Sequence, residues 1–185
     1  MTAIRSAWDG LLTRVRPGAL IAIGCGIAAL VVVLVVVLTD GGPTRAEPEE
    51  AGLAKLRVAA EEAGFPVYWA GEMGGFQYEL SRTKDGSVYV RYVPDGTPIG
   101  DQRPDFLTIG SYPVANAPAE LRKEAKKVDA PLEHLGAKGL TYTDPANPTS
   151  VYLTFRDADF EIEVYDPDPA RAAELVQGDQ LFPIR

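Results

Sequence analysis

Residues 151–165, with the sequence VYLTFRDADFEIEVY, decide the fold of this chain. Apolar and polar residues alternate through both ends of the segment, which is the period of a strand with one buried face. The residues between them, Arg156-Asp-Ala-Asp159, have the composition of a turn. We therefore predict two strands joined by this turn. Their core face would consist of Val151, Leu153, Phe155, Phe160, Ile162 and Val164.

The same kinds of signal extend through residues 50–185. Further strands are predicted at 67–70, 76–81, 88–93, 106–112 and 140–143, with an Asp-Gly turn at 84–87. One helix is predicted from Leu53 to Ala63, a second opens near Asn116, and a third is capped by Asp168. Together these signals predict an α+β domain with a mostly antiparallel sheet and about three helices.

Two short segments of the chain resemble two later segments, which is a sign of internal duplication. Residues 75–78 (GFQY) resemble 139–142 (GLTY), and residues 87–90 (SVYV) resemble 150–153 (SVYL). Each pair follows a predicted helix and brackets a polar turn, so the order helix, strand, strand occurs twice. The alternative is that strands rich in Val and Tyr look alike by chance.

Residues 19–38 predict one transmembrane helix in front of this domain. They form a stretch of twenty residues without a charge, which is about the length needed to cross a bilayer. The apolar core is too long for a cleaved signal peptide, and residues 40–46 offer no Ala-x-Ala site. A lipid-modified Cys25 is disfavoured because the apolar stretch continues beyond it, and a buried soluble helix is rarely so uniformly apolar.

The flanks of the span predict its orientation. Arg5, Arg14 and Arg16 precede it, and short flanks rich in Lys or Arg stay in the cytoplasm. We therefore expect a single-pass protein of the cell membrane. Residues 1–18 would form a cytoplasmic tail, either an interfacial helix or disordered, residues 39–49 a flexible tether, and residues 50–185 the extracytoplasmic domain. The missing disulfides and glycosylation acceptors favour a bacterial envelope.

Charge and cysteine content exclude several classes of function. After the span the chain carries 15 basic and 25 acidic residues, a formal net charge of −10, so nucleic acid is not an expected partner. The single cysteine, Cys25, lies inside the predicted span, which leaves the exported domain no thiol chemistry. No cofactor is expected.

Catalytic and metal-binding signals are weak. His134 is the single histidine and lies between two leucines, which favours a partly buried packing residue over a catalytic base. Asp157 and Asp159 lack the spacing of a calcium loop. Glu161 and Glu163 point the same way off a strand, which is typical of a solvated face. We therefore assign no catalytic residue and no metal ligand.

Tyrosines on the polar faces of the predicted strands are the most informative feature outside the core. A strand face that carries Tyr, Arg and Glu could bind an envelope protein or a glycan, because tyrosine combines apolar area with a hydroxyl. The alternative is ordinary cross-strand pairing. The candidate binding residues are Tyr89, Arg91, Tyr152, Arg156 and Tyr165.

A stripe of small residues marks one side of the predicted span. Gly18, Ala22 and Gly26 recur every four residues, which would let another helix approach closely. The sequence as a whole predicts a membrane-anchored recognition or scaffold module. The alternatives are an envelope hydrolase that uses carboxylates and an accessory subunit recognised through its transmembrane helix.

Overall fold

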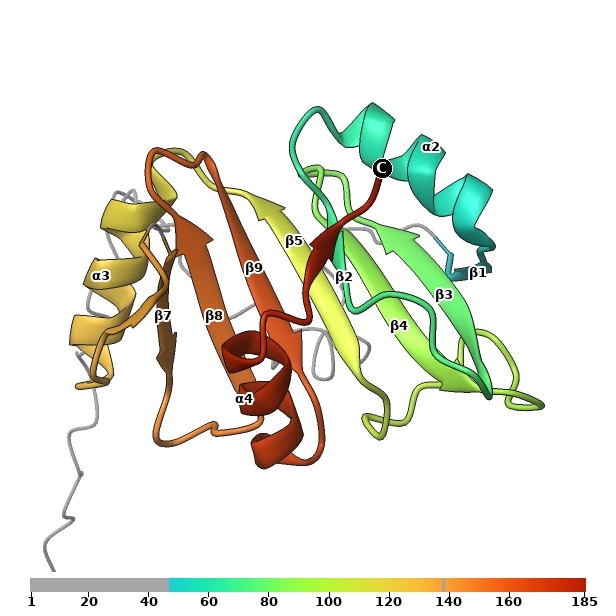
Figure 1. The fold of residues 1–185 in the computed structure, drawn as a ribbon. Coiled ribbons are helices and arrows are strands. Elements are labelled where there is room, and N and C mark those ends of the chain that lie inside the picture. Colours follow the sequence, from blue (N-terminus) through green and yellow to red (C-terminus); the bar gives the residue numbers. More distant parts are fainter. Residues whose placement is uncertain (1–46, 138) are drawn as a thin grey trace, which may run out of the picture.

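The computed structural model describes residues 47–137 and 139–185 (Figure 1). This part of the chain is an α+β domain with three helices and a mostly antiparallel sheet, as predicted. The elements in chain order are β1 (Glu49–Glu50), α2 (Leu53–Ala63), β2 (Tyr68–Trp69), β3 (Phe76–Arg82), β4 (Val88–Pro94), β5 (Thr108–Pro113), α3 (Ala117–Lys127), β6 (Glu133–Leu135), β7 (Gly139–Thr143), β8 (Ser150–Phe155), β9 (Phe160–Tyr165), α4 (Pro169–Gln177) and β10 (Phe182–Pro183).

One eight-stranded sheet organises the domain. Its order is β1-β3-β4-β5-β9-β8-β7-β6, and every pairing in it is antiparallel. The central pair joins β5 to β9, with Ile109 opposite Val164 and Ser111 opposite Ile162. The remaining short strands, β2 and β10, pair with each other.

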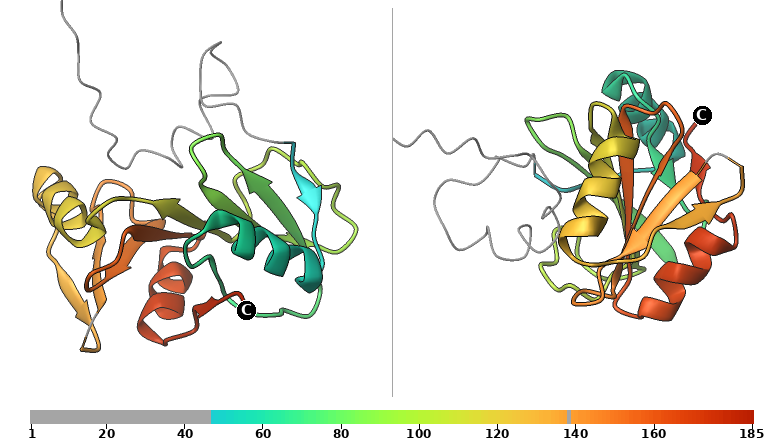
Figure 2. Two further views of the ribbon diagram at one scale, coloured as in Figure 1. Left: turned by 90° about the horizontal axis from the view of Figure 1, so that it is seen from above. Right: turned by 90° about the vertical axis from the view of Figure 1, so that its left-hand side faces the viewer.

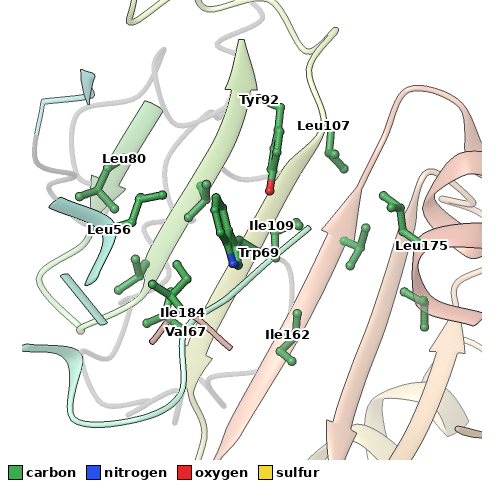
Figure 3. Close-up of a cluster of buried hydrophobic side chains, with 14 of the residues drawn as sticks. Leu56, Val67, Trp69, Leu80, Tyr92, Leu107, Ile109, Ile162, Leu175 and Ile184 are labelled. Atoms are coloured by element: carbon green, nitrogen blue, oxygen red, sulfur yellow. The ribbon is translucent and has the colours of Figure 1, made fainter. Parts of the chain in front are cut away.

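The first face of the sheet carries the main hydrophobic core, which is covered by α2, α4, β2 and β10 (Figures 1 and 3). Leu56 from α2, Trp69 from β2 and Leu175 from α4 pack with side chains of the central strands. Val151, Leu153, Ile162 and Val164 are fully buried there, whereas Phe155 and Phe160 pack at its margin. The predicted core face of residues 151–165 is therefore confirmed.

The second face is covered differently. Helix α3 packs over β7, β8 and β9, where Leu121 and Ala125 meet Leu140, Tyr142 and Tyr152 in a smaller cluster (Figure 2). Beside β3 and β4 the loop of residues 95–107 folds back onto the sheet, and the Arg91 guanidinium donates hydrogen bonds to its carbonyl oxygens. The second face is therefore polar as well as buried.

Local signals account for the helix ends and turns. Asp168 accepts a hydrogen bond from the backbone N–H of Ala170 at the start of α4, as a helix N-cap does. Helix α2 ends at Gly64, whose φ of 74° is the left-handed conformation that glycine adopts readily. Both ends were predicted from these residues.

The duplication is supported only in part. The hairpins β3–β4 and β8–β7 lie on either side of the central pair, and Val88 and Val151 both face the main core. However, Tyr78 contacts that core, whereas Tyr142 lies under α3 on the opposite face. The equivalent tyrosines of the resembling segments thus point in opposite directions.

The predicted tail, span and most of the tether, together with Gly18, Ala22 and Gly26, lie outside the described residues. Within residues 47–137 and 139–185, no helix has the length and apolarity needed to cross a bilayer.

Candidate functional site: a buried glutamate–tyrosine cluster

Two glutamates lie buried at the centre of the second face. Glu161 and Glu163 of β9 are 1% and 0% exposed. The expectation that they form a solvated face is wrong, because α3 and neighbouring side chains of the second face enclose this part of β9. Burying a carboxylate without a cationic partner costs several kcal/mol, so these two residues are the least ordinary feature of the described fold.

Three tyrosines lie around the two carboxyl groups, and a fourth, Tyr89, packs against one of the three. The rings of Tyr142 and Tyr152 stack with centroids 5.1 Å apart, and those of Tyr89 and Tyr112 meet edge to face at 5.6 Å. Tyr152 lies directly opposite Glu163 in the β8–β9 pairing, and Tyr112 lies opposite Glu161 in the β5–β9 pairing. We call these four tyrosines, Glu161, Glu163 and the nearby Glu124 of α3 the glutamate–tyrosine cluster.

Hydrogen bonding in the cluster is incomplete. The Tyr112 hydroxyl donates to Oε2 of Glu163 at 2.6 Å. The other oxygen of that carboxyl group, Oε1, has no hydrogen-bond partner, nor has Oε2 of Glu161. Most buried polar atoms in proteins are paired, so two unpaired carboxyl oxygens on adjacent positions of one face are exceptional.

Burial also disfavours ionisation of the two carboxyl groups. It raises the pKa of Glu161 from 4.5 to about 8, with further contributions from the charges of Glu163 and Glu124. Burial likewise raises the pKa of Glu163, although the hydroxyls of Tyr112, Ser150 and Tyr152 oppose the shift. The cluster therefore holds protons at neutral pH that exposed glutamates would have lost.

The tyrosines respond to the same environment. Burial, followed by the charge of Glu163, raises the pKa of Tyr112 and of Tyr152. For Tyr142, burial again dominates, followed by the charge of Glu161. The phenols consequently remain neutral donors that can hydrogen-bond to a carboxylate.

A glycine makes room for this arrangement. Gly110 lies between Tyr89 and Glu163 in the sheet, where other residues would project a side chain onto the second face. The Tyr112 ring occupies that space, because a Cβ atom at Gly110 would approach its hydroxyl oxygen to 2.5 Å. The missing side chain of Gly110 thus lets Tyr112 reach Glu163.

A second buried glutamate on the same face has a complete set of partners. Glu79 of β3, which is fully buried, accepts hydrogen bonds from the Arg91 guanidinium at 2.7 Å and from the backbone N–H of Gly100 at 2.7 Å. The Arg91 guanidinium also lies 5.0 Å from the centre of the Phe106 ring. A carboxylate, a guanidinium and an aromatic ring therefore form one unit there.

The candidate binding residues do not form one open surface. Tyr89 and Tyr152 belong to the cluster and are only 3% and 8% exposed, while Arg91 is engaged by Glu79. Tyr165 is half-buried and its hydroxyl donates to the Pro104 carbonyl, whereas Arg156 is exposed in the turn between β8 and β9. The structure thus places Tyr152 beside Glu163 and Tyr89 against the Tyr112 ring, and it leaves the other three outside the cluster.

His134 is also not where the sequence places it. The expectation of a partly buried packing residue is wrong, because His134 is exposed on β6, the last strand of the sheet. Among the residues that the structure describes, no group of three or more His, Cys, Asp or Glu side chains is arranged to hold a metal ion.

Glu161, Glu163 and Tyr112 were missed as site residues because a strand that alternates apolar and charged residues is typical of a half-solvated sheet. One signal was available: Gly110, a glycine inside a predicted strand, often marks a close approach by another group. No family model, curated protein or solved structure matches the chain.

Proposed function

We propose that the chain is a membrane-anchored recognition module whose extracytoplasmic domain binds an envelope protein at the glutamate–tyrosine cluster. The anchor is the apolar span at residues 19–38, with Arg5, Arg14 and Arg16 on its cytoplasmic side. The observation that supports a binding role is the pair of unpartnered, buried carboxyl oxygens on Glu161 and Glu163.

The cost of burying Glu161 and Glu163 favours a functional role for them over a purely structural one. An apolar pair at positions 161 and 163 would satisfy the fold at lower cost, since buried charges without partners destabilise a domain. Local violations of this kind concentrate where a protein acts. A tyrosine-lined pair of carboxyl groups that becomes anionic when a cation displaces its protons suits a cationic group of a protein better than a neutral glycan.

One observation also favours a second candidate, an envelope hydrolase. A glutamate with a pKa of about 8, such as Glu161, is protonated at neutral pH and has the form required of a general acid. Against this, His134, the residue that could assist a hydrolase, lies on the outermost strand β6, and β7 and β8 separate it from β9. Recognition is therefore the better-supported function.

The test is site-specific photocrosslinking of the full-length chain in its own membrane. Tyr112, the half-buried member of the cluster, is replaced by p-azidophenylalanine, which keeps the aromatic ring in place. The matched control carries the same photoreactive residue at Val58, which is exposed on α2 on the opposite side of the sheet. Recognition through the cluster predicts a discrete adduct from position 112 and none from position 58.

The second arm of the test removes one carboxylate without changing its shape. Glu163→Gln in the position-112 background should abolish the adduct, whereas Glu61→Gln, at an exposed position of α2, should leave it unchanged. An adduct that persists in the Glu163→Gln protein, or that forms equally at position 58, would show that the cluster is not the binding site.

A further inference from the structure

Two buried carboxyl sites on one sheet face differ in whether a cationic side chain is present. At Glu79 the carboxylate has the Arg91 guanidinium at 2.7 Å, which lies against Phe106. At Glu161 and Glu163 the carboxyl groups and the aromatic rings are present. Within the described residues, however, neither carboxyl group has a Lys or Arg partner. The ion pairs of this part of the chain involve other acidic residues.

From this difference we infer that the glutamate–tyrosine cluster binds the guanidinium group of an arginine side chain presented by the partner protein. The inference rests on the proposed function and names the chemistry of the ligand. The guanidinium would satisfy the free oxygens Oε2 of Glu161 and Oε1 of Glu163 and would lie against tyrosine rings, as Arg91 lies against Phe106.

The chemistry of the cluster favours guanidinium over other cations. Its planar fork of N–H donors can reach two carboxyl oxygens at once, and it stacks on aromatic rings. It is also more weakly hydrated than an ammonium group, so transfer into a buried site costs less. A divalent metal is disfavoured because the described residues provide no suitable ligand group of three or more side chains.

The proposal places entry to the cluster beside Tyr112. Tyr112 is the most exposed member of the cluster, while its other tyrosines and glutamates are buried. Its ring rests in the space above Gly110 and is held by the hydrogen bond to Glu163. The proposed entry therefore requires the Tyr112 side chain to rotate away from the Glu163 carboxyl group and to give up this hydrogen bond.

Binding should depend on pH because the ligand and protons compete for the same oxygens. The titratable groups beside the two carboxyls are Glu124 from α3, Tyr112 from β5, Tyr142 from β7 and Tyr152 from β8, and Tyr89 from β4 contacts the Tyr112 ring. Lys127 pairs with Glu124 at 2.5 Å. Burial raises the pKa of Tyr112, Tyr142 and Tyr152, so these phenols stay neutral, and the pH dependence up to about pH 8 follows from Glu161.

The experiment measures binding of small probes by isothermal titration calorimetry. The full-length chain is placed in nanodiscs of neutral phosphatidylcholine, which avoids adsorption of cations to the lipid. The probes are N-acetyl-arginine methylamide, the corresponding lysine compound, and the neutral isostere N-acetyl-citrulline methylamide. We expect the arginine probe to bind at least about tenfold more tightly than either of the others, which corresponds to about 1.4 kcal/mol.

Variants and pH complete the test. Glu163→Gln should weaken the arginine probe at least about tenfold, and the exposed control Glu61→Gln should not. Affinity should rise from pH 6 to pH 8 as the Glu161 carboxyl group ionises. Circular dichroism verifies that each variant is folded, and Glu161→Gln replaces Glu163→Gln if the latter does not fold.

Equal affinities for the arginine and citrulline probes, or equal affinities of the parent and the glutamine variant, would overturn the inference. A pH-independent affinity would do so as well. If the photocrosslink at position 112 still depends on Glu163 in that case, the proposed function stands and only the guanidinium chemistry fails. If the photocrosslink is absent too, both proposals fail.

Discussion

Tyr112 folds back over Gly110, so that a Cβ atom added to Gly110 would lie 2.5 Å from the Tyr112 hydroxyl oxygen. This relationship couples the backbone of β5 to the carboxyl group of Glu163, which accepts the hydrogen bond of that hydroxyl. A methyl group added at Gly110 of β5 would therefore disturb the hydrogen bond to Glu163 of β9.

Gly110→Ala should displace the Tyr112 ring and break its hydrogen bond to Glu163. Because overpacking and the lost bond act together, we expect a loss of about 1–3 kcal/mol in the free energy of unfolding. Urea denaturation of residues 47–185 measures it. Gly74→Ala is the matched control, since Gly74 has open space and no positive φ. A loss equal to that of the control, or one unchanged in a Tyr112→Ala background, would contradict this coupling.

The stability of the domain should fall as the pH rises from about 5 to about 8. The folded state keeps a proton on Glu161 up to a pKa of about 8, whereas the unfolded chain loses it near 4.5. Each group of this kind destabilises the fold by about 1.4 kcal/mol per pH unit within that window. The full contribution to stability is present below about pH 4.5 and is lost above about pH 8.

Urea denaturation at a series of pH values measures this slope. Glu161→Gln should flatten it and should be more stable than the parent above pH 7, because the amide carries no charge to bury. A parent whose stability is constant, or rises, between pH 5 and pH 8 would show that Glu161 is not protonated in the folded state.

Ile162→Ala tests the assignment of the sheet faces. Ile162 is fully buried in the main core, on the opposite side of β9 from its two glutamate neighbours. Its truncation should reduce the free energy of unfolding by about 2–5 kcal/mol. Val58→Ala, at an exposed position of α2, should cost no more than about 0.5 kcal/mol. Comparable losses in the two variants would place Ile162 outside the core.

Topology is tested with a reporter fused after Arg185. The arginines before residues 19–38 predict that this end lies outside the membrane. A reporter that is active only after export should therefore be active, and one that is active only in the cytoplasm should be silent. A reporter that is active only in the cytoplasm would show that the domain is not exported, and the proposed location would then be wrong.

The sequence predicted those features that short-range patterns determine. Alternation along residues 151–165 identified Ile162 and Val164 as core, and the Asp168-Pro169 pair located the start of α4. The short strands β1, β6 and β10 were missed, because two or three residues carry no period and pair only after distant segments have met. Local sequence patterns thus predict which residues form helices and long strands better than they predict which strands pair with one another.

The candidate site was harder to predict because burial on the second face is a tertiary effect. Glu163 has the strand position of a solvated residue, and only the arrival of Tyr112 and Tyr152 beside it creates the cluster. Tyr89 and Tyr152 were named as candidate binding residues on a polar strand face, but the sequence could not show that they are buried. The burial of the Glu161 and Glu163 carboxyl groups could be found only from the structure.

The central pairing of β5 with β9 has a consequence for the order of folding. It joins residues that are 47 to 57 positions apart, from Pro113 with Phe160 to Thr108 with Tyr165. A chain that emerges N-terminus first can form β3, β4 and β5 early, but the free edge of β5 must wait for β9. During that interval the unpaired backbone edge of β5 is open to other chains. Slow emergence of residues 114–159 should therefore favour aggregation, and rapid emergence should favour the native sheet.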